Sequence, residues 1–130
     1  MEHNNKTVGD LIMEGISFFN KNDIFKAFDC FKQVHILGYS DMVILHIATI
    51  ARLNNNEAMG LLTHLAENGN KNAQRELGIC YNLGMGVEKD IKESYKWWEK
   101  AAKKGDEFSI IRINEYKNED LKQIADEFKK

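Results

Sequence analysis

The chain has 130 residues, a formal net charge of −2 and a hydrophobic content of 43%, and it contains no proline. This length suits one domain, residues 1–130, with a single continuous core. The near-neutral charge argues against a protein built to neutralise nucleic-acid phosphates, and no apolar run reaches the roughly 18 residues that a membrane-spanning helix needs.

The apolar spacing predicts an all-α chain of eight helices. They run near residues 7–20, 23–37, 41–53, 55–68, 71–83, 91–104, 106–117 and 120–129. Consecutive helices pair into four hairpins, near residues 7–38, 39–69, 70–105 and 106–130, of which the last is short. The run of three asparagines at 54–56 marks a tight turn inside the second hairpin.

The second helix of each hairpin repeats one pattern of side chains. It opens on an Asp or Asn that we expect to cap the helix N-terminus: Asp23, Asn54, Asp90 and Asp120. A small residue follows four positions later in three copies: Ala27, Ala58 and Ser94. After four more comes a large apolar residue: Phe31, Leu62 and Trp98. The fourth copy has Ile124 and Phe128 in these columns, and the first three close on Gly38, Gly69 and Gly105, where a helix C-terminus needs a left-handed residue.

The copies are spaced 31, 36 and 30 residues apart, measured between their first columns. A period of this length is typical of stacked helical hairpins that share one core. In the third copy Glu93 follows Asp90 at the spacing of a capping box. The same hairpin has a longer loop, in which Gly84 and Gly86 can take positive φ and Val87 is expected to fold back as an apolar plug.

The third hairpin carries a further set of residues at fixed places: Leu77, Gly78, Tyr81, Gly84, Gly86, Val87, Asp90, Trp97, Trp98, Ala101, Ala102 and Gly105. This set resembles a Sel1-like repeat, a relative of the tetratricopeptide repeat with a longer loop between its helices. Ser94 departs from the alanine usual there. The first hairpin is closer to the plain tetratricopeptide pattern, through Gly15, Phe18, Ala27 and Phe31. The resemblance implies a right-handed α-solenoid of about four stacked hairpins.

The sequence predicts no catalytic, cofactor or metal site. The glycines at 84 and 86 lack the third glycine and the GKS or GKT of a phosphate loop, and His35, His46 and His64 lie on three expected helices without metal-ligand spacing. Cys30 and Cys80 fall in different hairpins, which favours reduced thiols of a cytoplasmic protein. Trp97 is expected to pack between repeats, with an interface role as the alternative.

The resemblance implies that the first helices line a concave groove, which binds a partner protein or peptide. The expected contact residues combine apolar anchors, amides and two arginines able to grip carboxylates. They are Ile12, Ile16, Phe19, Asn20, Arg52, Asn72, Arg75, Ile79 and Asn82, with Leu45 and Thr49 added on the third helix. Ile12, Ile16 and Ile79 fit a role in the core equally well.

The functional hypothesis is a non-enzymatic, monomeric, cytoplasmic interaction protein that acts as an adaptor or as a dedicated inhibitor. A bacterial immunity protein that neutralises a toxin is one version, by analogy of size and slightly acidic charge. Two other classes stay open. Some secreted Sel1-like relatives are linked to binding or hydrolysis of β-lactam-type ligands, although this chain lacks their cysteine pairing. An uncovered end face at Ile124 and Phe128 would instead support self-assembly.

Overall fold

The computed structural model describes residues 5–128, apart from the side chains of residues 120, 121, 124 and 128, and these residues form helices and connecting turns without any strand. The elements in chain order are α1 (Val8–Asn20), α2 (Ile24–Ile36), the 3-10 helix η1 (Ser40–Met42), α3 (Ile44–Arg52), α4 (Asn56–Glu67), α5 (Lys71–Leu83), α6 (Ile91–Lys103) and α7 (Glu107–Phe128). The all-α prediction is therefore confirmed.

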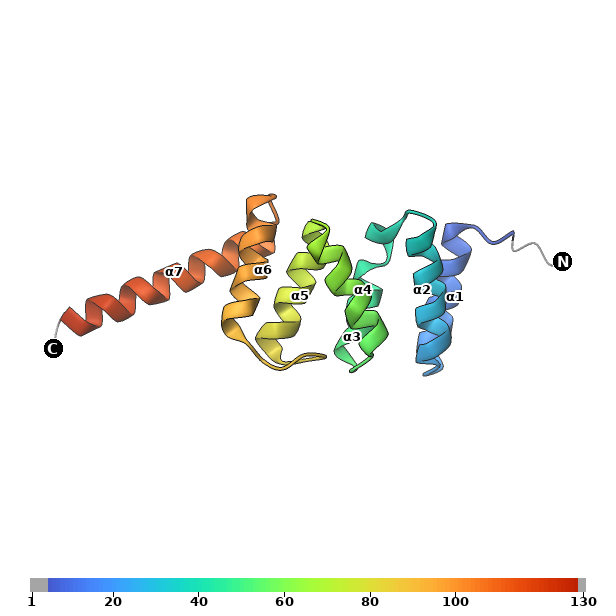
Figure 1. Ribbon diagram of the computed structural model, residues 1–130, viewed down its shortest axis with the longest axis horizontal. Coiled ribbons are helices and arrows are strands. Elements are labelled where there is room, and N and C mark those ends of the chain that lie inside the picture. The colour runs from blue at the N-terminus through green and yellow to red at the C-terminus, as the bar shows by residue number, and fades with distance from the viewer. Residues whose placement is uncertain (1–4, 129–130) are drawn as a thin grey trace.

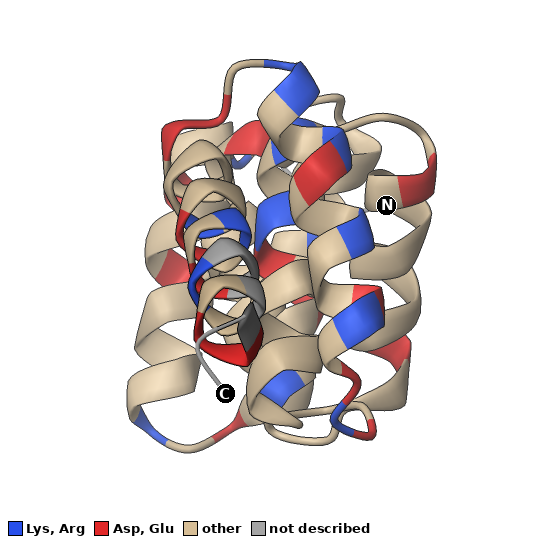
Figure 2. Ribbon diagram, turned by 90° about the vertical axis from the view of Figure 1, so that its left-hand side faces the viewer, with Lys and Arg blue, Asp and Glu red and all other residues tan. Residues whose placement is uncertain are grey.

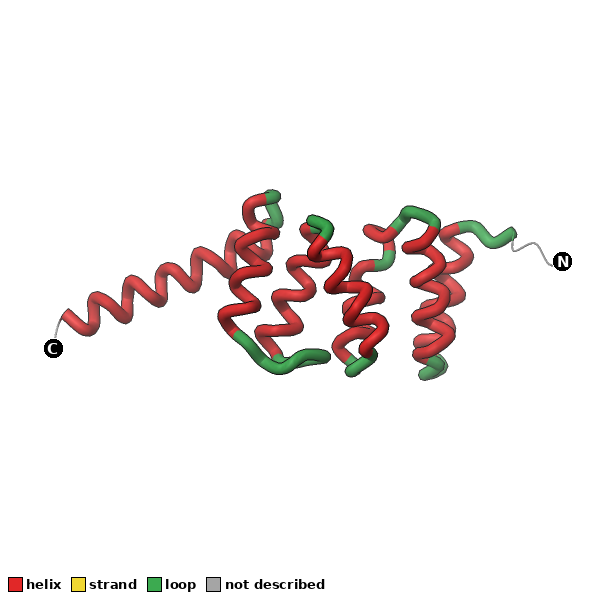
Figure 3. Tube along the Cα trace, in the orientation of Figure 1, coloured by secondary structure: helices red, strands yellow, loops and turns green. Residues whose placement is uncertain are grey.

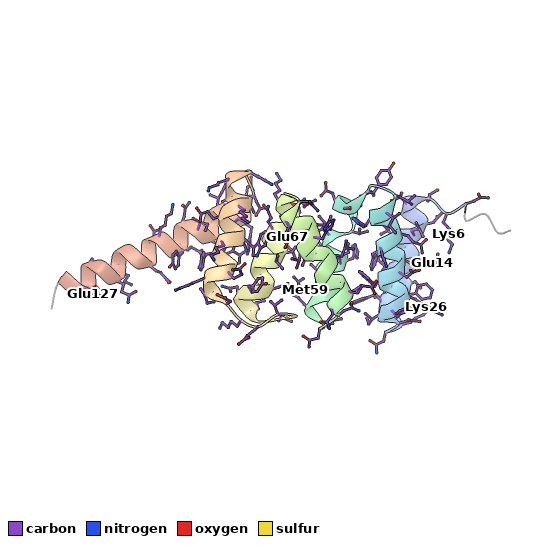
Figure 4. The ribbon with its side chains drawn as sticks, in the orientation of Figure 1. Lys6, Glu14, Lys26, Met59, Glu67 and Glu127 are labelled. Carbon is purple, nitrogen blue, oxygen red and sulfur yellow. The ribbon has the colours of Figure 1, made fainter. Side chains whose placement is uncertain are left out.

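Three hairpins, α1–α2, α3–α4 and α5–α6, stand side by side along the long axis of the molecule, and α7 follows them (Figure 1). The two helices of each hairpin pack closely, and α5 packs on both α3 and α4. The termini lie at opposite ends: Lys6, Glu14 and Lys26 are at one end and Glu127 is at the other (Figure 4). Basic and acidic residues are interspersed on the helices (Figure 2).

The columns of the second helices form the middle of the core. The small column is fully buried at Ala27, Ala58 and Ser94, and the large column is at most 1% exposed at Phe31, Leu62 and Trp98. The three closing glycines, Gly38, Gly69 and Gly105, have φ angles of 95°, 94° and 88°. This is the left-handed conformation that ends a helix and that glycine adopts at little cost.

A glycine in the first helix lets a large ring of the second helix approach in two hairpins. A Cβ added at Gly15 would lie 2.6 Å from the ring of Phe31, and one added at Gly78 would lie 2.3 Å from the ring of Trp98. The Ser94 hydroxyl donates to the Gly78 carbonyl at 2.7 Å, which explains why serine stands where alanine is usual. The third hairpin is thus closed by both packing and hydrogen bonds.

The predicted caps are confirmed at two of the positions and wrong at a third. Asp23 accepts from the Lys26 backbone and Asp90 from the Glu93 backbone. Asn54 does not cap α4. It has a φ of 65°, and Asn55 caps the helix instead by accepting from the Ala58 backbone at 2.9 Å. Three adjacent asparagines offer both roles, and the first of them takes the left-handed turn because asparagine tolerates that conformation.

The capping box expected at Asp90 and Glu93 is only half formed. The Asp90 backbone N–H donates to the Tyr81 carbonyl at 3.0 Å rather than to the Glu93 side chain. A complete box occurs instead at Thr7 and Asp10, at the start of α1. Short polar side chains therefore cap the starts of α1, α2, α4, α5 and α6, whereas α3 begins after Val43 without a side-chain cap.

The prediction of a fourth hairpin over residues 106–130 is wrong. The chain forms one continuous helix, α7, across the turn expected between 117 and 120, so Asp120 lies inside a helix and not at the start of one. Residues 107–128 contain neither glycine nor proline, and nothing in them forces a helix to end. The side chains of Ile124 and Phe128, expected in the small and large columns, lie outside the described residues.

The loop between α5 and α6 runs along one edge of the array toward α3 (Figure 3). Gly84 ends α5 in the left-handed conformation, and Gly86 has a φ of 80°. A Cβ at Gly86 would lie 2.3 Å from the Ala51 carbonyl oxygen, so the loop rests directly on the end of α3. Val87 packs against the core, which confirms its role as an apolar plug.

Candidate partner-binding face

The expected contact residues lie on the first helices α1, α3 and α5. We call the side that these helices share with the start of α7 the inner face. Five of the nine residues take part in one of two cavities or in an ion network beside them. Phe19 lines an apolar pocket, and Asn72, Arg75 and Ile79 line a polar cleft. Arg52 joins the ion network, and Arg75 belongs to both. The other residues lie outside both cavities: Asn20 is exposed, Asn82 is partly exposed, and Ile12 and Ile16 pack partly buried against the core.

The apolar pocket lies where the first hairpin meets the second. It has a volume of about 170 Å³ and is lined by Phe19, Phe31, His46 and Thr49. The rings of Phe31 and His46 stack with their centroids 4.7 Å apart. The Thr49 hydroxyl donates to the Leu45 carbonyl at 2.8 Å, so its hydrogen-bonding capacity is used inside α3. Burial lowers the pKa of His46, which favours the neutral ring at physiological pH.

The polar cleft lies between α5 and the start of α7. It has a volume of about 560 Å³, and its walls combine charged, amide and apolar side chains. They include Lys71, Asn72, Arg75, Ile79 and Phe108. The Phe108 ring packs edge-on against Trp98 at 5.7 Å between centroids, which fixes one wall of the cleft.

An ion network joins three successive inner helices. Arg52 of α3 contacts Glu76 of α5 at 3.2 Å, and Arg75 contacts the other Glu76 oxygen at 3.1 Å. Arg75 also contacts Asp106, at the start of α7, at 2.7 Å. Both carboxylates are 5% exposed, whereas the two arginines keep 20% and 22% of their side-chain surface. The arginines therefore already hold carboxylates of their own chain.

The network fixes the charge of its members. Burial alone would raise the pKa of Asp106, but hydrogen bonds from Ser109 and the contact with Arg75 together lower it. Burial likewise opposes the charge of Arg75, yet the Glu76 and Asp106 side chains raise its pKa. The charged forms of Arg75 and Asp106 are thus favoured where they meet.

The two thiols do not resemble reactive groups. Cys30 and Cys80 are both buried and unpaired with each other. Burial is the main cause that raises the pKa of each thiol, and at Cys80 it outweighs the opposing effect of Arg52. The more reactive thiolate is therefore disfavoured at both positions.

The described residues contain neither a metal-binding cluster nor a membrane-spanning helix. Within residues 5–128 no three His, Cys, Asp or Glu side chains stand together in a group that would hold a metal ion. No described helix is long and apolar enough to cross a membrane.

Sequence reasoning missed four side chains that shape the inner face: His46, Glu76, Asp106 and Phe108. In the sequence, Glu76 and Asp106 resemble ordinary surface carboxylates. Arg52 lies 24 residues before Glu76 and Arg75 lies 31 residues before Asp106, so neither contact is visible locally. One signal was present. Asp106 precedes α7 as Asn70 precedes α5, and both accept a hydrogen bond from the backbone three residues later, so Asp106 is recognisable as an N-cap.

Comparison with known proteins places the repeat in the third hairpin. Residues 71–106 match the Sel1 repeat family. A 48-residue segment is 38% identical to the rat (Rattus norvegicus) protein named DAP3-binding cell death enhancer 1, and it makes up 37% of this chain and 9% of that protein. No solved structure matches the chain. The chain therefore contains a Sel1 repeat at residues 71–106, set within an array of helical hairpins.

Proposed function

We propose that this protein is an interaction module that binds a partner protein or peptide on its inner face. The observation that carries the proposal is the convergence of Asn72, Arg75, Ile79 and Phe108 on one cleft between α5 and α7. Apolar walls beside fixed hydrogen-bond donors suit a protein surface better than a small polar substrate. The Sel1 match supports this class, as does the rat relative, which is named for binding another protein.

The cleft offers donors that the chain leaves available. Among the described residues, none accepts a hydrogen bond from Nη2 of Arg75 or from Nδ2 of Asn72, although other atoms of both side chains are paired. The ion network holds the Arg75 guanidinium in place, so ordering it costs a partner little entropy. A partner backbone carbonyl or carboxylate at the cleft would find these donors already oriented.

A finer version of the proposal makes the protein a dedicated inhibitor or an adaptor that acts as a cytoplasmic monomer. An immunity protein against a toxin is one form of such an inhibitor. The small size of the array and its net charge of −2 favour a basic partner over an acidic one, by long-range attraction. Catalysis is not part of the proposal.

The test is capture of a partner from host lysate by three folded proteins: wild type, Phe108→Glu and Phe25→Glu. Phe108 borders the cleft, whereas Phe25 is 79% exposed on α2 and serves as a matched control with the same change of side chain. We expect one dominant partner, bound at least tenfold more weakly by Phe108→Glu and equally well by Phe25→Glu. Circular dichroism checks that both variants keep their helices.

Two results would contradict the proposal. A partner lost only with Phe25→Glu would move the interface to the second helices. Recovery of no protein above background, under conditions in which the wild type stays monomeric and folded, would count against an interaction module as a whole.

A further inference from the structure

The pocket between the first two hairpins differs from the polar cleft because no charged side chain lines it. Its four lining residues are Phe19, Phe31, His46 and Thr49, and the neutral form of His46 is favoured. A charged group placed there would lose its hydration without gaining a counter-ion. The pocket therefore selects for an uncharged occupant.

The polar atoms of the walls give an occupant little to bind. The Thr49 hydroxyl proton is donated to the Leu45 carbonyl. Nδ1 of His46 has no partner among the described residues, but it is buried and so out of reach of an occupant. Three of the four walls are rings, which favour edge-to-face and offset contacts with another ring. The volume of about 170 Å³ is close to that of an apolar cavity of roughly 150 Å³ that binds benzene. Size and chemistry both match one aromatic ring.

The pocket opens on the inner face and not on an isolated surface. Leu45 lies one helical turn before Thr49 on α3 and is 58% exposed. On α1, Ile16 lies one turn and Ile12 two turns before Phe19, and both pack partly buried against the core. These side chains give the pocket an apolar surround, continuous with the face that carries the polar cleft.

We propose that this pocket is a docking site for one uncharged aromatic side chain, a phenylalanine, of the partner that binds the inner face. The inference rests on the proposed function and adds to it a second, apolar contact point, separate from the donors of the cleft. Buried aromatic anchors of this kind carry a large share of the binding free energy at protein interfaces.

The first arm of the test asks whether the pocket accepts the ring. Toluene, the side chain of phenylalanine as a free molecule, is titrated into the full chain while aromatic NMR signals are followed. We expect saturable shifts at Phe19, Phe31 and His46 in the wild type and in Thr63→Met, a matched change on α4. Thr49→Met, which fills the pocket, should abolish them, and Phe19→Leu, which removes one wall, should weaken them. Absence of a saturable shift in the folded wild type would overturn the inference.

The second arm asks whether a partner uses the pocket. Peptides are selected from a random displayed library on the wild type, and we expect enrichment of one phenylalanine position. Its change to alanine, or Thr49→Met in the protein, should weaken binding at least tenfold, while Thr63→Met leaves it unchanged. Selected peptides that bind Thr49→Met normally but fail on Phe108→Glu would overturn the docking site and leave the proposed function standing.

Two outcomes separate the remaining cases. If toluene binds but no selected peptide depends on the pocket, the pocket is a small-ligand site and the docking inference is wrong. If no peptide is selected at all, the proposed function fails and the docking inference fails with it, whatever the toluene result.

Discussion

The junction between the first two hairpins and the junctions around the third are held by different forces. At the first, α2 meets α3 through apolar side chains and the stacked rings of Phe31 and His46, with a pocket beside them. Around the third hairpin, the ion network spans α3, α5 and α7, and the Gln74 amide donates to the Ala66 carbonyl of α4 at 3.0 Å.

This difference separates two properties of a repeat array. Directional polar contacts fix the spacing and rotation of neighbouring hairpins, because they are satisfied in only one arrangement. Apolar contacts tolerate small displacements and leave space that a ligand can fill. The Sel1 hairpin is thus the fixed part of the inner face, and the first junction is the part able to adjust.

The largest expected effect comes from Gly78→Ala compared with Gly15→Ala. The new Cβ at 78 would meet Trp98, which is held by its bond to the Arg75 carbonyl, so we expect about 3 kcal/mol of destabilisation, at the upper end for overpacking. Phe31 can shift into the pocket beside it, and Gly15→Ala should cost less than about 1 kcal/mol. Urea unfolding followed by circular dichroism measures both, and equal costs would show that Phe31 is held as firmly in its hairpin as Trp98 is in the third.

The next effect is the loss of a network arginine. Arg75→Ala leaves the largely buried Asp106 without a cation and Glu76 with Arg52 alone. We expect a loss of about 2–3 kcal/mol, below that of a fully buried pair because Arg75 keeps some solvent. Arg52→Ala removes one contact with Glu76 and should cost about 1 kcal/mol. The same unfolding experiment compares them. A larger cost for Arg52 would mean that α3–α5 is the stronger link.

A pH effect should follow from Asp106. Its lowered pKa means that the folded state favours the carboxylate, so the stabilisation is present above about pH 4 and is lost as the pH falls through the folded pKa. Ser109→Ala removes the hydrogen bond from the hydroxyl to Asp106 and keeps the one from the backbone N–H. We expect it to destabilise the fold by about 1.5 kcal/mol at neutral pH. The gap between variant and wild type should shrink toward pH 2.5. A gap that stays constant from pH 7 to 2.5 would contradict this assignment.

The smallest effect is expected at the surface of the first junction. Lys32 of α2 and Glu57 of α4 form an ion pair at 2.9 Å, and both side chains are well exposed. Lys32→Ala should change the free energy of unfolding by no more than about 0.5 kcal/mol, with the difference vanishing at 1 M salt. A cost above about 1 kcal/mol that persists in salt would show that polar contacts hold this junction as well.

Local patterns in the sequence predicted most of the helices. α5 begins and ends where the sequence predicts. The helices α2, α4 and α6 each end two residues before the expected glycine, at Gly38, Gly69 and Gly105. Caps and glycine stops act over a few residues, so their signals are adjacent in the chain. The prediction of a fourth hairpin was wrong because it extended the repeat pattern past residue 117. No glycine or proline marks a turn near residue 118, so the local sequence favours one continuous helix.

The site was less predictable because its contacts are distant in sequence. Phe19 and Thr49 line one pocket although they come from different hairpins, and the Phe31 and His46 rings that complete it stack across the same junction. Arg52 and Arg75 were selected as residues that grip carboxylates, and the chain supplies those carboxylates itself at Glu76 and Asp106. Only the relative placement of the helices reveals such pairs.

The difference in contacts between the first junction and the later ones also has a mechanical consequence. If the molecule is pulled by its two ends, the load passes through every junction in series, and the weakest one yields first. The first hairpin lacks the ion pairs that tie α3, α5 and α7, so we expect it to peel away at low force while the Sel1 hairpin stays folded. Force spectroscopy would record this as a short early extension step, followed by a later and longer one.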